Sequence, residues 1–263
     1  MSSVLEVKNL YFNYGNSQIL KDINLNISEG SFLSILGPNG SGKTTLLKNI
    51  CNLLKPRQGE ILVKDIGLNS ISYKELAKIM AVVHQGDNVN FDFTVHDIVL
   101  MGRYPYQKRF QSESQYSLDI VKRVMEDTET WELKEKSINE ISGGERQRVM
   151  IARALSQEPE ILLLDEPISH LDINHQINIL NLCRRLNKKK GITIIMTLHD
   201  INLAGRYSDY ILLLEHGKIR DLDIPRRVLT AENIKDVYGI DVELLNNQQR
   251  KVPYIIPKMS SLH

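Results

Sequence analysis

The sequence predicts an α/β protein with a mostly parallel sheet into which a helical segment is inserted. Three observations support this prediction. Short apolar runs of strand length recur along the chain, and those beyond residue 157 alternate with helical patterns. Residues 86–157 contain no comparable apolar run, and their pattern is polar and helical. Because strands that alternate with helices are typical of parallel sheets, the middle segment is expected to be an insertion.

Each expected element follows from apolar periodicity and from turn signals. Strands are expected at residues 4–7, 20–27, 31–36, 60–64, 79–84, 161–164, 192–197 and 210–214. Helices are expected at residues 43–54, 73–78, 97–101, 114–126, 145–155, 173–186 and 201–207. The predicted organisation is therefore a core with a β subdomain (1–85 and 158–240), a helical subdomain (86–157) and a C-terminal extension (241–263) without readable chemistry.

The composition is that of an ordinary soluble globular chain. Of its 263 residues, 42% are hydrophobic and 25% are charged, which is enough apolar material for a sizeable core. The 33 basic and 32 acidic residues nearly balance, so the charge gives no argument for a nucleic-acid partner. Cys51 and Cys183 suit a reducing compartment and predict neither a disulfide framework nor a metal cluster. We see no signal peptide and no apolar run of membrane-spanning length, so any work at a membrane requires docking onto other chains.

A glycine-rich loop links the expected strand at residues 31–36 to the following helix. Its sequence, Gly-Pro-Asn-Gly-Ser-Gly-Lys-Thr, spans residues 37–44 and matches G-x-x-x-x-G-K-[ST]. Backbone N–H groups must approach phosphates closely there, and glycine permits the required backbone angles. Lys43 is suited to reach the terminal phosphates, the Thr44 hydroxyl to bind Mg²⁺, and the helix N-terminus to favour an anion. The motif predicts a nucleotide but does not choose among kinases, GTPases and transport ATPases.

Two carboxylates follow the apolar run at residues 161–164. A buried parallel strand delivers its C-terminal end to the ligand crevice. Asp165 is placed there to bind Mg²⁺, and Glu166 is placed to orient and polarise the attacking water. A strand that simply ends in a polar turn before Pro167 is the alternative, and the phosphate loop makes the functional interpretation the stronger one.

A second glycine-containing helix start occurs at residues 141–148, Ile-Ser-Gly-Gly-Glu-Arg-Gln-Arg. This segment resembles the Leu-Ser-Gly-Gly-Gln signature of ABC ATPases, with Ile141 and Glu145 as mild departures. Ser142 and its glycines offer a hydroxyl, bare N–H groups and a helix N-terminus to an anion. The resemblance implies a RecA-like P-loop NTPase core with an N-terminal antiparallel β subdomain and the inserted helical subdomain. It also implies a head-to-tail homodimer in which two ATP molecules are sandwiched between phosphate loop and partner signature.

The order of the remaining motifs also resembles that family. Gln85 matches the glutamine loop, Asp172 matches the loop that crosses to the partner chain, and His199 matches the switch histidine at the γ-phosphate. Tyr14 resembles the aromatic that stacks on adenine, although such an aromatic is often core packing, and Asp200 and Asn202 are expected to cap the next helix. The resemblance implies the following site residues: Glu166, His199, Lys43 and Gln85 for catalysis; Thr44, Gln85 and Asp165 for Mg²⁺; and Tyr14, Gly37, Pro38, Asn39, Gly40, Ser41, Gly42, Lys43, Thr44, Thr45, Ser142, Gly143, Gly144, Glu145 and Asp172 for ATP.

Further segments sharpen the resemblance to one group of importers. They include residues 93–105, 198–204, 237–242 and 252–257. Together they are similar to ATP-binding subunits of importers for iron–siderophore complexes, haem or cobalamin. Such subunits lie on the cytoplasmic face of the membrane and pair with permeases and, indirectly, a substrate-binding protein. The stretch 86–110 is expected to dock the permease through Phe91, Phe93, Arg103, Tyr104 and Tyr106.

Three rival functions share some of these features. A soluble ABC ATPase acting on nucleic acid or ribosomes usually carries coiled coils or two ATPase units, and this chain shows neither pattern. A small-molecule kinase would share the phosphate loop but would not need the segment at residues 142–145. An ABC exporter or another importer type stays open, because the cargo is chosen by other chains.

Overall fold

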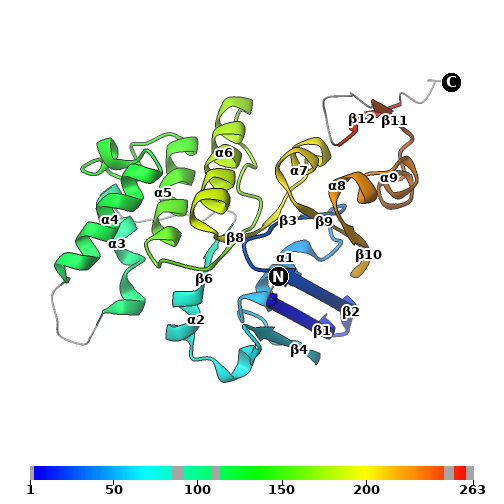
Figure 1. Ribbon diagram of the computed structural model, residues 1–263, viewed down its shortest axis with the longest axis horizontal. Helices are drawn as coiled ribbons and strands as arrows, with labels where there is room; N and C mark the ends of the chain where they lie inside the picture. Colours follow the sequence, from blue (N-terminus) through cyan, green and yellow to red (C-terminus); the bar gives the residue numbers. More distant parts are fainter. Residues whose placement is uncertain (1–2, 85–91, 108–112, 246–251, 259–263) are drawn as a thin grey trace. The chain divides into compact units, whose positions relative to one another are not determined.

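The computed structural model describes residues 3–84, 92–107, 113–245 and 252–258 (Figure 1). The chain folds into two compact units. The first unit comprises Met1–Ser70 and Ile195–His263, and the second unit comprises Ile71–Ile194. The architecture is α/β with a mostly parallel sheet and a helical subdomain, as the sequence predicts. The predicted subdomain limits at residues 85, 157 and 240 stay predictions, because the two units divide the chain at other positions.

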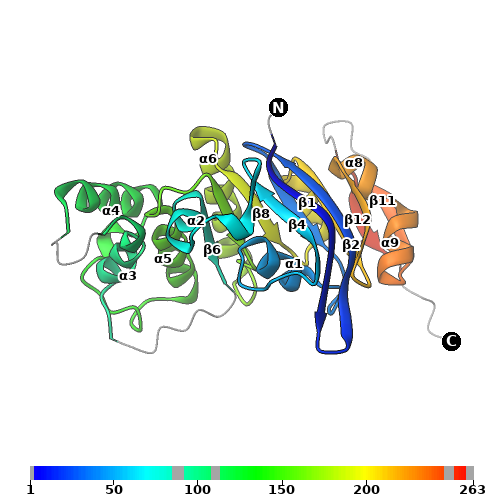
Figure 2. The same ribbon diagram turned by 90° about the horizontal axis from the view of Figure 1, so that it is seen from below.

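The first unit begins with an antiparallel sheet. Its strand order is β2-β1-β4-β5, formed by β1 (Ser3–Tyr14), β2 (Ser17–Ser28), β4 (Gln58–Val63) and β5 (Ile66–Gly67). The long β1–β2 hairpin is seen in blue in Figure 2. Its inward residues are apolar, and Leu10, Leu20 and Ile23 are fully buried. The sequence predicts parts of these strands only, because polar residues at register shifts interrupt the alternation.

Parallel strands form the second layer of the first unit. β3 (Phe32–Leu36) pairs in parallel with β9 (Tyr210–Glu215), and β10 (Lys218–Asp223) pairs antiparallel with β9. β8 (Thr193–Thr197), where the chain returns from the second unit, lies next to β3 in the strand order. β3 and β8 are buried along their whole length, as expected for strands covered on both faces. The carboxyl end of β3 leads into the glycine-rich loop and α1 (Lys43–Ile50).

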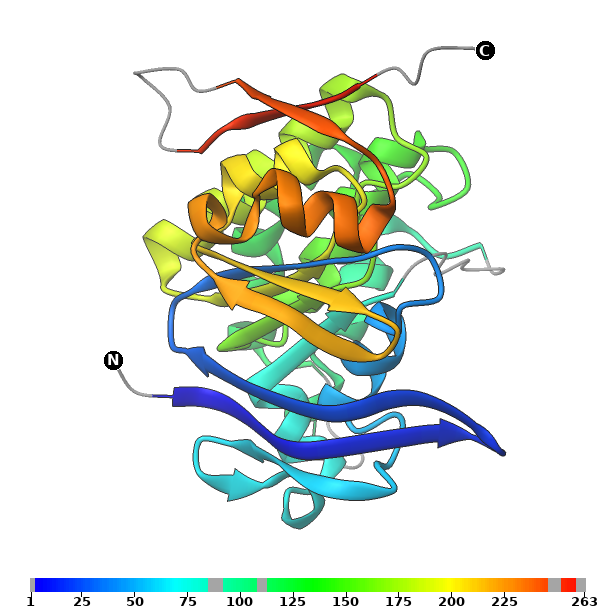
Figure 3. The ribbon, with the colours of Figure 1, turned by 90° about the vertical axis from the view of Figure 1, so that its right-hand side faces the viewer.

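The C-terminal elements also belong to the first unit. They are α7 (Ile201–Tyr207), α8 (Pro225–Val228), α9 (Ala231–Tyr238), β11 (Val242–Leu245) and β12 (Tyr254–Pro257). β11 and β12 pair as an antiparallel two-stranded sheet, drawn in red tones at the top of Figure 3. The sequence predicts α7 but not α8, α9 or this hairpin, because each of these elements is short and depends on packing for its stability.

The second unit contains the helical subdomain and two further parallel strands. β6 (Met80–Val83) and β7 (Ile161–Leu164) pair in parallel, and β7 is completely buried. The helices are α2 (Tyr73–Ile79), α3 (Val95–Met101), α4 (Gln115–Asp127), α5 (Gly143–Leu155) and α6 (Ile173–Lys190), and single 3₁₀ turns lie at Tyr104–Tyr106 and Trp131–Leu133. Figure 1 shows α3, α4 and α5 as a cluster in green. A search of the described residues finds no helix that is both long enough and apolar enough to cross a bilayer.

Candidate functional site

The glycine-rich loop of the first unit has the backbone geometry that a phosphate cradle requires. Gly37, Gly40 and Gly42 have φ angles of 153°, 78° and 106°, in the region that side chains disfavour. A Cβ built on Gly37 would lie 2.2 Å from the Leu214 carbonyl oxygen and 2.7 Å from Ser41 Oγ. The loop therefore needs glycine at position 37 for space as well as for conformation.

The polar groups of the loop are directed to its interior. Lys43 is only 6% exposed, and its Nζ donates to the carbonyl oxygens of Gly37 (2.8 Å) and Pro38 (3.1 Å). Ser41 is 3% exposed, and its hydroxyl is among the buried polar atoms of the described chain that have no hydrogen-bond partner. An unsatisfied buried hydroxyl beside a buried ammonium is what a phosphate oxygen would complete. The loop thus fits a phosphate group.

The helix that follows the loop starts without a protein cap. Gly42 occupies the N-cap position, supplies no side-chain hydrogen bond, and is followed by a first turn with no acidic residue. The first turn of α1 carries the positive end of the helix dipole. Such an N-terminus is suited to an anion.

In the second unit, the acidic pair follows the buried strand β7 as predicted. Asp165 is 5% exposed, and its backbone N–H donates to the carbonyl oxygen of Val83 (3.0 Å). Glu166 adopts a left-handed conformation (φ 49°), and its carboxylate accepts a hydrogen bond from Ser169 Oγ (3.1 Å). A left-handed glutamate is sparsely populated, and such strain gathers at functional sites. The described residues contain no cluster of three metal-ligating side chains, and Mg²⁺ held mainly by nucleotide phosphates would not need one.

The predicted signature segment forms the N-terminus of α5. Ser142 Oγ accepts from the Glu145 N–H (3.3 Å), and the Glu145 carboxylate accepts from the Ser142 N–H (2.8 Å). This reciprocal capping box fixes the start of the helix. The hydrogen bonds from the Ser142 backbone and side chain hold the pKa of Glu145 below its usual value. The segment therefore presents a serine hydroxyl and two glycine N–H groups together with a carboxylate.

Within the second unit, His175 joins the signature segment to Asp172. The Asp172 carboxylate caps α6 by accepting from the His175 N–H (2.9 Å), and its other oxygen lies 2.8 Å from His175 Nδ1. The hydrogen bond from the His175 backbone is the main cause of a lowered Asp172 pKa. The ring of His175 covers Gly144 so closely that a Cβ there would lie 1.8 Å from its Cδ2. The sequence analysis missed His175, and its spacing of three from Asp172 was the available signal.

In the first unit, His199 lies between β8 and α7 and is exposed. Asp200 caps α7, since its carboxylate accepts from the Leu203 N–H (2.8 Å), which confirms one expected cap. The expectation for Asn202 was wrong. Its side-chain amide bonds the backbone of Ile255 instead, because the first turn of α7 already has its cap.

Tyr14, Gln85 and Phe91 are further residues that the sequence assigns to the site or to permease docking. Tyr14, at the end of β1, is 49% exposed, and its ring meets Phe12 edge-to-face at a centroid distance of 4.9 Å. An exposed ring at this position leaves its outer face open to stacking, while Phe12 is the core residue of the pair. Gln85 and Phe91 lie outside the described residues.

Tyr238, at the end of α9, is a contact of the phosphate loop that the sequence did not reveal. Its hydroxyl is buried and lacks a well-formed hydrogen bond within the described part of the chain. Burial raises the pKa of Tyr238 to about 12, and the backbone N–H of Gly37 acts in the opposite direction. A C-terminal residue therefore lies against the first glycine of the loop.

Arg103 is not part of the expected docking surface. It is 1% exposed, donates to the Ser156 carbonyl oxygen (2.5 Å) and to Glu158 Oε2 (2.9 Å), and lies over the Tyr106 ring at 4.0 Å. Its charge is satisfied inside the second unit, so it anchors α3 rather than contacting a partner. Tyr104, in contrast, is 75% exposed.

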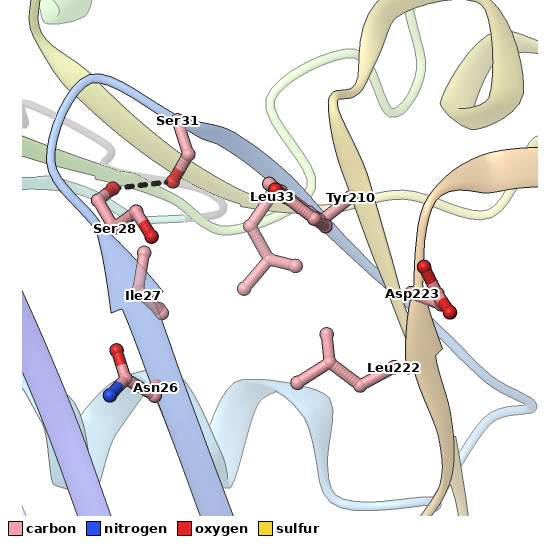
Figure 4. Close-up of a pocket in the computed structure, with 8 residues that line it drawn as sticks. All are labelled: Asn26, Ile27, Ser28, Ser31, Leu33, Tyr210, Leu222 and Asp223. Carbon is pink, nitrogen blue, oxygen red and sulfur yellow. Dashed lines mark hydrogen bonds between the residues drawn. The ribbon is translucent and has the colours of Figure 1, made fainter. Parts of the chain in front are cut away.

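A pocket of about 520 Å³ in the first unit lies at the opposite end of β3 from the glycine loop (Figure 4). Two of its polar side chains already have partners: Ser31 Oγ donates to the Ser28 carbonyl oxygen, and Asp223 accepts from Ile224 N–H and Arg227. The Arg227 side chain and Ile224 backbone lower the pKa of Asp223 accordingly. This pocket offers little to fix a charged ligand and is not the nucleotide site.

Comparison with known proteins identifies the family. The model of the ABC transporter family matches residues 20–169. The chain belongs to the ABC transporter family. It is an ATP-hydrolysing, nucleotide-binding subunit of that family, which confirms the resemblance of its motifs.

The relatives of this ABC subunit match it over almost its whole length. The iron(3+)-hydroxamate import ATP-binding protein FhuC of Bacillus subtilis is 37% identical, over 95% of this chain and 93% of the relative. The hemin import ATP-binding protein HmuV of Pseudomonas entomophila is 39% identical, over 97% of this chain and 100% of the relative. An ABC transporter described as metal-chelate type, in an inward-facing conformation, matches with a TM-score of 0.87 at 27% identity and covers 99% of both chains. The cassette MJ0796, in a dimeric post-hydrolysis state with ADP and Pi, matches with a TM-score of 0.72 at 33% identity over 84% of this chain and 99% of that chain.

Proposed function

We propose that this ABC subunit powers an importer for an iron–siderophore, haem or cobalamin-type substrate from the cytoplasmic face of a membrane. Two permease subunits and, indirectly, a substrate-binding protein are its partners. Relatives named for hydroxamate, hemin and enterobactin transport, which extend along 95–97% of the chain, support this cargo class. The observation that carries the ATP-dependent part is the glycine loop, where an uncapped helix start adjoins the buried Lys43 and the unsatisfied Ser41 hydroxyl.

Each site residue has a proposed role. Residues 37–45 hold the phosphates of ATP, Lys43 neutralises their charge, and Thr44, Gln85 and Asp165 bind Mg²⁺. Glu166 orients the attacking water and accepts its proton, while His199 stabilises charge on the γ-phosphate. Tyr14 stacks on the adenine. Catalysis of phosphoryl transfer needs positioning and charge stabilisation rather than covalent chemistry.

Two copies of the chain are proposed to close on two ATP molecules. Ser142, Gly143, Gly144 and Glu145 of one copy face the γ-phosphate held by Lys43 of the other, and Asp172 lies at the same boundary. Because hydrolysis removes the γ-phosphate, it removes the link between the copies. The dimer then relaxes, and residues near Gln85 and the exposed Tyr104 transmit the change to the permeases.

The test of this function is the variant Glu166→Gln, which removes the general base while preserving side-chain volume. We expect MgATP to bind, turnover to fall at least about 100-fold, and an ATP-dependent dimer to accumulate in size-exclusion chromatography. Glu126→Gln on α4 is a matched control on an exposed helix face. Turnover at the wild-type rate in Glu166→Gln would refute the assignment. ATP-dependent uptake of ferric siderophore, haem or cobalamin by vesicles containing the co-purified permease tests the cargo.

A further inference from the structure

The side-chain amide of Asn202 holds the C-terminal hairpin in the manner of a neighbouring strand. Its Nδ2 donates to the Ile255 carbonyl oxygen (3.1 Å), and its Oδ1 accepts from the Ile255 N–H (2.8 Å). The primary amide of asparagine can direct one of its two N–H donors and its carbonyl oxygen at the N–H and carbonyl groups of a single backbone residue. Asn202 is on the first turn of α7, and Ile255 is in β12, 53 residues later in the chain.

Packing around this pair fastens the hairpin to α7. Ile255 is 4% exposed, and the two hydrogen bonds are partly buried. One turn further along α7, a Cβ built on Gly205 would lie 2.8 Å from Leu229 Cδ1 and 3.0 Å from Val252 Cγ1. The glycine thus permits close approach of the helix to the segment that precedes β12. The amide pair and the glycine contact together define a built interface between α7 and the C-terminal segment.

The same helix begins immediately after His199. On one side of the histidine, the Leu198 N–H donates to the Ile35 carbonyl oxygen of β3 (3.2 Å). On the other side, Asp200 caps α7. His199 is therefore held between a strand of the core and a helix whose first turn is fastened to the C-terminal hairpin. A shift of α7 would move the histidine without disturbing the strand.

We propose that Asn202 is a positioning residue for His199, and that the C-terminal hairpin serves as its anchor. This inference rests on the proposed role of His199 at the γ-phosphate. Loss of the amide pair frees the first turn of α7, and a displacement of about 1 Å in a group that contacts the reacting phosphate costs up to about 100-fold in rate. Because the hairpin is proposed to act only through His199, its loss is expected to change the rate of hydrolysis more than the affinity for ATP.

The test is the variant Asn202→Ala, compared with wild type in the full-length chain. We expect kcat for MgATP to fall about tenfold, with KM for ATP changed less than about twofold. Asn202→Asp keeps an acceptor for the Ile255 N–H but sets a carboxylate oxygen against the Ile255 carbonyl. It is expected to lose as much activity as the alanine variant, although its volume is unchanged.

Asn233→Ala is the matched control. The Asn233 amide also donates two partly buried hydrogen bonds in the first unit, to Asp221 Oδ2 and the Val228 carbonyl oxygen, both at 2.9 Å. Its removal is expected to lower the unfolding temperature while kcat stays within about twofold of wild type. A fall in kcat equal to that of Asn202→Ala would mean that general destabilisation explains both, and the proposal would be wrong.

A double-mutant cycle with His199→Ala separates this inference from the function on which it rests. If Asn202 acts through the histidine, Asn202→Ala changes kcat less than about twofold in the His199→Ala background. A tenfold fall in both backgrounds would overturn the positioning role. Wild-type turnover in His199→Ala alone would instead refute the proposed role of His199. An unchanged kcat in Asn202→Ala, with His199→Ala impaired, would overturn this inference alone.

Discussion

The two helix starts that the sequence assigns to phosphate differ in how their N–H groups are satisfied. α1 begins at a left-handed Gly42, with no side-chain cap and no acidic residue in its first turn. α5 begins at Ser142 inside a complete capping box with Glu145. Both helix starts contain glycine, but α1 lacks a side-chain cap, whereas α5 is capped by its own Ser142 and Glu145 side chains.

This difference indicates different tasks. Because α1 has no side-chain cap and no acidic residue in its first turn, the positive end of its dipole is not neutralised by a carboxylate, and we expect α1 to gain stability when phosphate binds. A capped N-terminus is stable without a ligand. It offers an anion only the hydrogen-bond donors that the capping box does not use. At α5 these are the N–H groups of Gly143 and Gly144, the first two residues of the helix. We therefore expect α1 to hold the phosphate and α5 to add a further contact to it.

Gly37 and Gly144 are confined by different kinds of neighbouring atoms. Gly37 abuts a backbone carbonyl, that of Leu214, which belongs to a buried strand. Gly144 abuts the ring of His175, whose side chain is 31% exposed and able to rotate away. A side chain introduced at position 37 would therefore meet fixed backbone atoms, whereas one introduced at position 144 would meet a side chain that can rotate away.

The largest effect is expected for Gly37→Ala. Both the φ angle of 153° and the 2.2 Å approach to Leu214 oppose a Cβ. We expect a loss of about 3 kcal/mol in the free energy of unfolding, from strain and overpacking together, and loss of measurable ATP binding. Urea unfolding and an ATP titration measure the two quantities.

Gly191→Ala is the control for the backbone angle alone. Gly191 also has a positive φ, 69°, but a Cβ there would meet no atom within 4 Å. It is expected to cost only about 1 kcal/mol and to leave ATP binding intact. Equal destabilisation by Gly37→Ala and Gly191→Ala would show that the Leu214 backbone moves to accommodate a Cβ at position 37.

A smaller effect is expected for Gly144→Ala. A Cβ would lie 1.8 Å from His175 Cδ2, so the ring must leave both Gly144 and Asp172. We expect a loss of about 2 kcal/mol and lower ATPase activity, and we expect His175→Ala in the same chain to restore most of the stability. Thermal unfolding of the four members of the cycle measures the coupling.

Gly143→Ala is the neighbouring control. Its Cβ would meet Leu171 Cδ2 at 3.6 Å, which is an ordinary contact, so the stability is expected to stay equal or rise slightly. Strictly additive losses from Gly144→Ala and His175→Ala would mean that the ring does not confine the glycine.

The sequence predicts those features of the two helix starts that arise from residues close together in the chain. Gly37, Lys43, Ser142 and Glu145 lie in contiguous motifs whose spacing encodes their chemistry, so their local geometry could be predicted. The capping box itself follows from a serine and a glutamate three residues apart.

The neighbours of these motifs could not be predicted, because they come from distant segments. Leu214, Tyr238 and Ile255 reach their partners only after the sheet and the C-terminal helices have assembled. Arg103 illustrates the same limit. A charged residue in an aromatic segment suggested an interface, but folding buries it against Ser156 and Tyr106.

The smallest expected effect concerns the charge of Glu145. Hydrogen bonds from Ser142 lower its pKa, so its contribution to stability is present above the pKa of the unfolded chain, about 4.3, and is lost as the pH falls through the lower folded-state pKa. Glu145→Gln keeps an acceptor for the Ser142 N–H but removes the charge near the dipole. It is expected to cost about 0.5 kcal/mol at pH 7, and this cost should shrink below about pH 4.5.

Urea unfolding of wild type and Glu145→Gln at pH 7, 5 and 3 measures this cost, with Glu126→Gln as a control at an exposed helical position. A difference that stays constant over this range would show that the carboxylate charge does not stabilise α5. The same variant also sharpens the comparison of the two helix starts. Removing the carboxylate gives α5 a first turn without negative charge, as in α1. Suppose that Glu145→Gln raises the rate of hydrolysis at limiting ATP and changes the free energy of unfolding by less than about 1 kcal/mol. The Glu145 carboxylate then repels the phosphate at the N-terminus of α5, and its main contribution is to the fold.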